Sequence, residues 1–440
     1  MRSAAEFVRN LKFDDLDQDA IERAKDCLLD FMGAVLGGAN TRAAQISLKF
    51  ADNFGGRGAS TVWCTGDKTS AQGATFVHGT VGSALDIDDG HRMAVGHPGG
   101  VVIPAAVSVA EENQCSGQAL IEAVVCGYEV GIRSGNISIS TNAGSGRWGS
   151  LGAAAAVAKI LGLNPEEIER ALAISATFTP VALCVEDLIN MGFMPMSKFS
   201  SGWGGVVGLC SALLGRDGFT GISSTVDFSK SSLPAFGEFF ETKNVYFKPY
   251  TCCRWTHPAV EGTLSLLREY GDLNKDTIRG IRIKIFSKGS HLRERRPQTM
   301  ESAQYSIPFL LGAAIIDGEL GPDQVAEGRL SDQEILRIAD KVEVVHSQEL
   351  DPYFPKQLPT EIEIETTSGS CYRTRVTTPK GDPKNPMSDA EFAEKFHRLA
   401  RMSVDVRTSE ALYGKLRALD RLDNVLDLTQ VLQEYFRKKN

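Results

Sequence analysis

The spacing of the apolar residues changes twice along this chain, and no other feature limits its possible folds as strongly. Up to about residue 250, apolar side chains recur at helical intervals, and glycine-rich loops separate the periodic segments. In residues 20–38 they form one stripe that ends at Gly37 and Gly38, and we expect Asp19 to cap this helix. A second helix should begin after Asn164, because this capping residue precedes a proline and two glutamates.

From about residue 279 the apolar residues alternate with basic ones, which predicts a half-buried strand. Residues 341–347 predict another strand, and residues 360–381 predict a hairpin that turns at Ser368 and Gly369. Apolar segments of helical character lie between these strands. This part of the chain is therefore expected to form a smaller α+β unit.

The helical period returns near the C-terminus, where Ser388 and Glu391 form a capping box and no strand pattern follows. A chain of 440 residues is also longer than a single core usually supports. We therefore predict a mainly α protein with two domains. Residues 1–257 and 391–440 would form a discontinuous all-helical domain, and residues 258–390 would form an α+β lid domain.

The composition excludes several functional classes. A net charge of −8 with scattered basic residues argues against nucleic acid or an anionic membrane as the main partner. The N-terminus carries acidic residues where a signal peptide needs an apolar core, and no apolar run is long enough for a membrane helix. The 9 cysteines lack zinc-site spacing. We therefore expect a cytoplasmic protein with reduced thiols. A small anionic substrate would need local lysines and arginines to overcome the net negative charge.

The segment LDIDDGHRMAVGHPGG, residues 85–100, combines ionisable groups with chain-breaking residues more densely than any other part of the chain. Its aspartates and histidines are candidates for proton transfer, because a carboxylate can orient a nearby imidazole or raise its pKa. A metal site is a weaker interpretation, since the pattern matches neither a zinc nor a calcium motif. A purely structural loop, with an aspartate capping a helix or pairing with Arg92, remains open on spacing alone.

Three further segments carry isolated basic residues. Arg147 stands in a glycine-rich loop before an alanine-rich helix and is a candidate carboxylate clamp, although the glycines can serve packing alone. Lys198 is a single lysine among apolar residues, where it either binds an anion or reaches solvent. Lys248, Arg254 and His257 lie close together at the predicted boundary between the domains, where ligand sites are common.

Taken together, these segments resemble the MmgE/PrpD family, which includes 2-methylcitrate dehydratase, cis-aconitate decarboxylase and iminodisuccinate epimerase. The resemblance covers nearly the whole chain and is carried by ERAKDCLLDFMGAVLGG, HGTVGSALDIDDGH with GHPGGVVIPAA, AAAAVAKILGLNPEEIERALAIS, KPYTCCRWTHPAVEG and YSIPFLLGAAIIDG. It implies a large helical domain made from both ends of the chain, an inserted α+β lid, and a cleft between them. It also implies a homodimer that needs no metal or organic cofactor.

The resemblance also carries over roles for particular residues. The acidic residue of the family's L-D-x-D-D motif falls on Asp86, and its histidine before the glycine turn falls on His97. The family's two lysines fall on or beside Lys198 and on Lys248, and the histidine of its His-Pro pair falls on His257.

Two positions depart from the family pattern. Many relatives have a second active-site histidine where this chain has Arg147 and Trp148. A tyrosine of the decarboxylases aligns with Phe309, although Tyr305 lies one helical turn away. These departures argue against cis-aconitate decarboxylation and weaken the case for dehydration.

The sequence thus predicts a lyase or isomerase that moves a proton next to a carboxylate of a small di- or tricarboxylate. Dehydration of the 2-methylcitrate type is the first choice, epimerisation of an amino- or iminodicarboxylate is the alternative, and a non-catalytic carboxylate-binding protein is the third. The predicted catalytic residues are Asp86, His97, Lys198 and Lys248. The predicted substrate-binding residues are His91, Arg92, Arg147, His257 and Tyr305.

Overall fold

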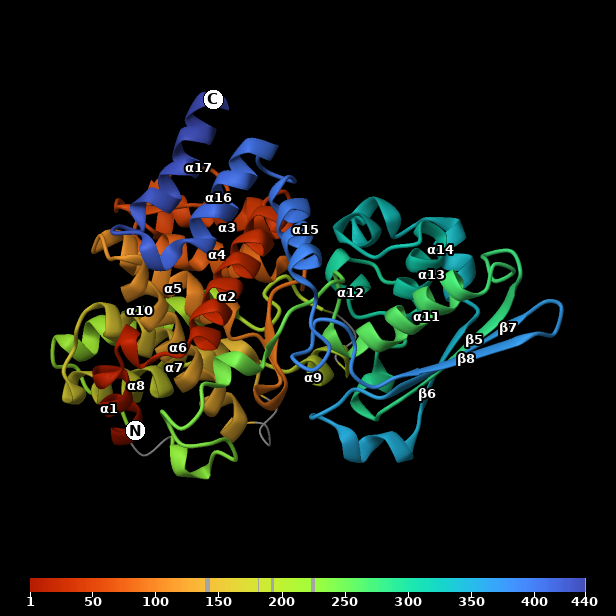
Figure 1. Ribbon diagram of the computed structural model, residues 1–440, viewed down its shortest axis with the longest axis horizontal. Helices are drawn as coiled ribbons and strands as arrows, with labels where there is room; N and C mark the ends of the chain where they lie inside the picture. Colours follow the sequence, from red (N-terminus) through yellow and green to blue (C-terminus); the bar gives the residue numbers. More distant parts are fainter. Residues whose placement is uncertain (139–142, 181, 191–193, 223–225, 440) are drawn as a thin grey trace.

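The computed structural model describes residues 1–138, 143–180, 182–190, 194–222 and 226–439, and it has two lobes (Figure 1). The helical lobe is built from the N-terminal half of the chain together with its C-terminal helices. The α/β lobe contains the segment between them and lies to the right in the view. The predicted fold class, mainly α with a smaller α+β part, is confirmed.

The helical lobe packs its small-residue helices around one large apolar core. Its helices are α1 (Arg2–Asn10), α2 (Gln18–Gly38), α3 (Arg42–Phe54), α4 (Ala71–Ala84), α5 (Gly99–Glu112), α6 (Gly117–Ser138), α7 (Ser145–Ile160), α8 (Pro165–Phe178) and α10 (Ser201–Arg216). The short helix α9 (Val185–Asn190) lies at the boundary with the other lobe (Figure 1). Two pairs of short strands, β1 (Ser60–Thr61) with β2 (Lys68–Thr69) and β3 (Gly90–His91) with β4 (Val245–Tyr246), join loops of this lobe.

The helix caps test the sequence predictions directly. Asn164 caps α8 and forms a capping box with Glu167, as its sequence indicates. The predicted cap of α2 was wrong, because Asp17 accepts the hydrogen bond from the backbone of Ala20. Asp19 lies instead in the first turn, where its charge interacts favourably with the helix dipole.

The α/β lobe contains a four-stranded sheet in the order β6-β5-β7-β8. Strand β5 (Ile278–Ile285) runs parallel to β6 (Val342–His346) and antiparallel to β7 (Thr360–Thr366), which pairs with β8 (Cys371–Val376). The predicted hairpin turn is confirmed, since Gly369 adopts the positive φ of 90° that such a turn requires. The helices of this lobe are α11 (His257–Glu269), α12 (Met300–Ala303), α13 (Ile307–Asp317) and α14 (Gln333–Ala339).

The last helices, α15 (Asp389–Ala400), α16 (Val406–Arg417) and α17 (Leu426–Lys439), return to the helical lobe (Figure 1). Phe396 and Leu399 of α15 lie against the small surface that Gly33 leaves on α2. The predicted capping box of Ser388 and Glu391 begins α15. The domain limits at 257/258 and 390/391 stay predictions. Within the described ranges, no helix combines the length and apolarity that a membrane crossing requires.

Candidate active site

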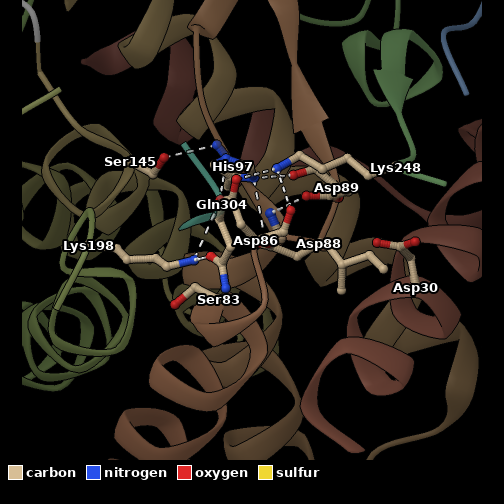
Figure 2. Close-up of polar contacts among 12 residues, drawn as sticks. Asp30, Ser83, Asp86, Asp88, Asp89, His97, Ser145, Lys198, Lys248 and Gln304 are labelled. Carbon is tan, nitrogen blue, oxygen red and sulfur yellow. Dashed lines mark hydrogen bonds and ion pairs between the residues drawn. The ribbon is translucent and has the colours of Figure 1, made fainter. Parts of the chain in front are cut away.

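Asp86 is the centre of a buried charge cluster that Figure 2 shows in close-up. It follows the end of α4, and its carboxylate lies 3.2 Å from Nζ of Lys248 and 3.8 Å from Nζ of Lys198. The two lysines reach toward it from opposite sides of the view. Tyr305 donates a hydrogen bond of 3.0 Å to the same carboxylate, and Nε2 of His97 lies 3.8 Å from it. The structure therefore brings together all four predicted catalytic residues and Tyr305.

These neighbours shift the proton affinities in different directions. Burial opposes the charge of Asp86, but Lys248 and Lys198 outweigh it and hold the pKa of its carboxyl below the usual range. Burial lowers the pKa of Lys198, which Asp86 only partly offsets. The pKa of Lys248 is raised instead, because the attraction of Asp86 outweighs its burial. Lys248 is thus held as a permanent cation, whereas Lys198 is the better proton donor.

His97 has one ring nitrogen fixed and the other available. Its Nδ1 lies 2.6 Å from the backbone carbonyl of Asp89, and a carbonyl only accepts, so Nδ1 carries the proton. Nε2 of the neutral ring is therefore unprotonated. Burial, followed by the charge of Lys248, lowers the pKa of His97. His97 donates the hydrogen bond that fixes its ring to the main-chain carbonyl of Asp89, and Asp86 lies 3.8 Å from Nε2. That Asp86 orients and tunes His97 stays a prediction.

A cavity with about 870 Å³ of space free of protein atoms, part of it open to solvent, lies beside His97 at the boundary between the lobes. The ring of His97 stacks on Phe199, with centroids 5.7 Å apart, and both residues line the cavity. The α/β lobe contributes Lys288 and Phe354 among others, and Arg254 and Trp255 line the cavity where the chain passes from one lobe to the other. Asp86, Lys198 and Lys248 are not among the lining residues, so the charge cluster lies directly behind His97.

The predicted substrate-binding residues are distributed unevenly. His91 and Arg92 line the cavity, but they face Glu241 at 3.2 Å and Asp382 at 2.5 Å, respectively. Arg147 is exposed on α7 and does not line the cavity, so the structure does not bring it to the site.

His257 is fully buried at the start of α11 and is not a lining residue either. Its Nδ1 lies 3.3 Å from Nη1 of Arg254, and Nε2 lies 3.2 Å from the carbonyl of Cys252. An arginine only donates, so Nδ1 accepts and Nε2 carries the proton. His257 therefore contacts Arg254 and does not itself line the cavity.

A second group of buried charges, which the sequence analysis missed, lies beneath the His97 loop. Asp89 accepts hydrogen bonds from Tyr128 at 2.6 Å and from the backbone of Gly99 at 3.0 Å. Burial and the nearby Asp30 raise the pKa of Asp89 to about 8. Asp30 pairs with Lys395 of α15, which also donates to the carbonyl of Ile87 at 2.9 Å. A lysine on the apolar stripe of α15 was the available signal for this pair.

The backbone of two site residues is strained. Asp86 and Lys198 adopt positive φ angles of 51° and 41°, which residues other than glycine rarely take. Such conformations cost about 1–3 kcal/mol each and persist where the surrounding structure imposes them, often at functional sites. Among the residues that the structure describes, no group of three histidine, cysteine or acidic side chains is arranged to hold a metal ion.

Comparison with known proteins identifies the family. Residues 2–238 match the model of the MmgE/PrpD N-terminal domain, and residues 250–416 match that of the MmgE/PrpD C-terminal domain. The chain belongs to the MmgE/PrpD family. The resemblance drawn from the sequence motifs is thereby confirmed.

Several relatives within this family are similar to the chain over almost its full length. A cis-aconitate decarboxylase-like protein, oryM, of Aspergillus oryzae is 27% identical and covers 97% of this chain and 95% of the relative. The cis-aconitate decarboxylase of Aspergillus terreus is 26% identical, with 97% and 94% coverage. That of Homo sapiens is 25% identical, with 98% and 94% coverage.

Proposed function

We propose that this MmgE/PrpD protein is a lyase that moves a proton next to a carboxylate of a small di- or tricarboxylate, without a metal or organic cofactor. One observation carries the proposal. His97 lines the cavity with its Nδ1 proton engaged at the Asp89 carbonyl, so the basic Nε2 stays free for a substrate proton. When Nε2 accepts that proton, Asp86 lies 3.8 Å away and stabilises the imidazolium.

The first candidate reaction is the dehydration of a hydroxy-tricarboxylate of the 2-methylcitrate type. His97 removes the proton from the carbon next to a carboxylate, and the C–H electron pair forms the double bond as the C–O bond breaks. The hydroxide leaves as water with the proton that the His97 imidazolium returns to it, which restores the neutral ring. Lys198 and Lys248 hold the charge of Asp86 next to His97 throughout.

Cis-aconitate decarboxylation is a second candidate, because the relatives described above carry that name. The sequence argument against it rested partly on a missing tyrosine, and the hydroxyl of Tyr305 lies 3.0 Å from Asp86. In this reaction the C–C bond to one carboxylate breaks, CO₂ leaves, and the electron pair stays on the carbon. That carbon then takes a proton from Nε2 of His97, which His97 takes up from solvent.

Epimerisation is the alternative that needs two bases on opposite faces of the substrate. Of the described side chains after residue 250 that line the cavity, Cys253 and Lys288 alone can exchange a proton. Burial raises the pKa of the Cys253 thiol and so removes it as a base. The second base would then have to be Lys288, and substitution of that residue tests this alternative.

The reaction is identified by mixing the protein with 2-methylcitrate, citrate, cis-aconitate and an aminodicarboxylate such as aspartate separately in D₂O and following each by NMR. A new alkene from either hydroxy acid indicates dehydration, and loss of one carbon from cis-aconitate indicates decarboxylation. Exchange of a carbon-bound proton without net product indicates epimerase-type chemistry. Absence of all three changes would refute the enzymatic proposal and favour a carboxylate-binding protein.

The role of His97 is tested by His97→Gln, which should lower the rate by about 100- to 10,000-fold, the usual contribution of a general base. His346→Gln is the matched control, because His346 lies on β6 and pairs with Asp351 away from the cavity. Equal rates in both variants would contradict the assignment. The homodimer implied by the family resemblance and the cytoplasmic location inferred from the composition remain predictions, and light scattering at several concentrations tests the first.

A further inference from the structure

Arg254 is a buried cation on the wall of the cavity. Its side chain is 4% exposed and lines the cavity where the chain passes from the helical lobe to the α/β lobe. The guanidinium lies 4.8 Å from the ring centre of Tyr246. Burial and the nearby Arg92 lower its pKa to about 10, so it stays charged at neutral pH. A buried charge costs several kcal/mol unless hydrogen bonds or an opposite charge compensate it.

The hydrogen bonds of Arg254 occupy only part of its guanidinium. Nη1 donates to the carbonyl of Lys380 at 2.8 Å and to Nδ1 of His257 at 3.3 Å, and Nη2 donates to the carbonyl of Pro379 at 2.8 Å. The group has five N–H bonds. The N–H group of Nε and the second N–H group of Nη2 therefore have no acceptor in these contacts. Nε has no hydrogen-bond partner among the described residues. These two N–H bonds form the edge of the fork that binds a carboxylate through both oxygens.

His91 and Arg92 also line the cavity, but unlike Arg254 each of them faces a carboxylate. His91 lies 3.2 Å from Glu241, and Arg92 lies 2.5 Å from Asp382. Arg254, in contrast, forms no ion pair with any described carboxylate. All its partners are neutral, so its positive charge is still available for an anion in the cavity.

We propose that Arg254 binds a carboxylate of the substrate, one that is not attached to the carbon deprotonated by His97, and thereby selects acids with at least two carboxylates. His257 is a positioning residue, because its neutral Nδ1 holds Nη1 of Arg254. The identity of the reacting carbon rests on the proposed function, whereas the binding of the carboxylate does not. Lys198 and Lys248 meanwhile remain engaged with Asp86.

The competing explanation is that Arg254 only ties two segments of backbone together. In that case the neutral acceptors would fully account for it, and a lysine or glutamine in its place would change stability but not ligand affinity. The two explanations separate when the binding of an unreactive acid is measured, because no turnover is needed.

The experiment is isothermal titration calorimetry with tricarballylate and succinate, which carry carboxylates but no hydroxyl leaving group. Arg254→Lys should weaken tricarballylate binding by about 10- to 100-fold, since it replaces a two-pronged charge-assisted contact by a single donor. Arg279→Lys is the matched control, because Arg279 is exposed on β5 and pairs with Glu365. It should bind as the wild type does.

A second pair of variants tests the positioning role of His257. His257→Asn keeps an acceptor for Nη1 and should retain most of the affinity, whereas His257→Leu removes the acceptor and should weaken binding toward that of Arg254→Lys. If Arg254→Lys does not fold, Arg254→Gln takes its place, because a glutamine amide can still donate to the carbonyl of Pro379.

Unchanged affinity in a folded Arg254 variant, or no binding of either acid by the wild type, would overturn the inference. The outcome for the proposed function is separate. Affinity that depends on Arg254 in a protein that exchanges no proton in D₂O would support the inference and refute the lyase. Turnover that is lost in His97→Gln, with a KM that substitution of Arg254 leaves unchanged, would support the lyase and refute the inference about Arg254.

Discussion

Asp89 should make the protein lose stability as the pH rises, and Asp89→Asn should abolish this loss. Its carboxyl is fully buried, and burial together with Asp30 raises its pKa from 3.8 to about 8. The unfolded chain has a normal pKa of about 3.9 at this residue. Between these values the folded protein holds a proton that the unfolded chain has released, so stability falls with rising pH.

The size of the effect follows from the displacement of the pKa. Each pH unit inside the window costs about 1.4 kcal/mol. The stabilising contribution is complete below about pH 4 and is lost as the pH passes about 8. Between pH 5 and pH 8 the wild type should therefore lose about 4 kcal/mol relative to Asp89→Asn. The asparagine keeps both contacts, since its oxygen accepts from Gly99 and its amide donates to the Tyr128 oxygen.

The measurement is urea unfolding of wild type and variant at pH 5 and pH 8, followed by the fluorescence of the buried Trp63 and Trp148. Comparing the two proteins at each pH cancels the titration of other groups that they share. Asp52→Asn, at an exposed position of α3, is the control and should unfold as the wild type does at both values. Parallel losses of stability in wild type and Asp89→Asn would refute the reasoning.

Three further predictions concern the site and its support. Lys248→Met should destabilise the fold by about 3–5 kcal/mol, because it leaves Asp86 buried with one cation fewer, and Asp86→Asn in the same chain should restore part of the loss in a double-mutant cycle. Because the pKa of His97 is lowered from 6.5, protonation of the base should reduce the rate only below pH 6.5. A pH–rate profile in which the rate already falls as the pH drops from above pH 7 would contradict the role of His97 as the base. Gly146→Ala should destabilise by about 1–3 kcal/mol, because its Cβ would lie 2.4 Å from the carbonyl oxygen of Ser200, whereas Gly414→Ala, with no neighbour within 4 Å, should be neutral or stabilising in thermal unfolding.

Local patterns predicted most of the fold because they depend on neighbouring residues alone. The caps at Asn164 and Ser388 and the hairpin turn at Gly369 are examples. Asp19 shows the limit of this reasoning, since two aspartates near one helix start compete for a single cap position. Backbone geometry decides between them, and a sequence pattern does not contain it.

The sequence predicted which residues gather at the site better than it predicted how their side chains are arranged. Motif resemblance brought Asp86, His97, Lys198 and Lys248 together, yet it did not indicate that the lysines face the aspartate rather than the cavity. Arg147 was expected at the site because its loop is rich in glycine. Those glycines instead let helices approach closely, as at Gly146, and the arginine remains outside.

The interrupted order of the chain explains how a charged wall arises at the boundary between the lobes. Because the α/β lobe is inserted, the chain crosses the boundary twice, once near Arg254 and again near residues 379–382. The two crossings are hydrogen-bonded to each other, from the backbone of Phe247 to the carbonyl of Gly381 at 2.9 Å. A Cβ at Gly381, with φ of 89°, would lie 1.8 Å from the Phe247 carbonyl, so only glycine permits this approach.

This contact sets the geometry of the guanidinium. Both carbonyls that hold Arg254 belong to the returning crossing, and Asp382, the partner of Arg92, follows them directly. Substitution of Gly381 should therefore separate the crossings and release both arginines from their acceptors, although the glycine contacts neither of them. Gly381→Ala should weaken tricarballylate binding in parallel with Arg254→Lys, whereas Gly414→Ala, whose Cβ would meet nothing within 4 Å, should bind it as the wild type does. Equal affinity in Gly381→Ala and wild type would show that the cation wall does not depend on the double crossing.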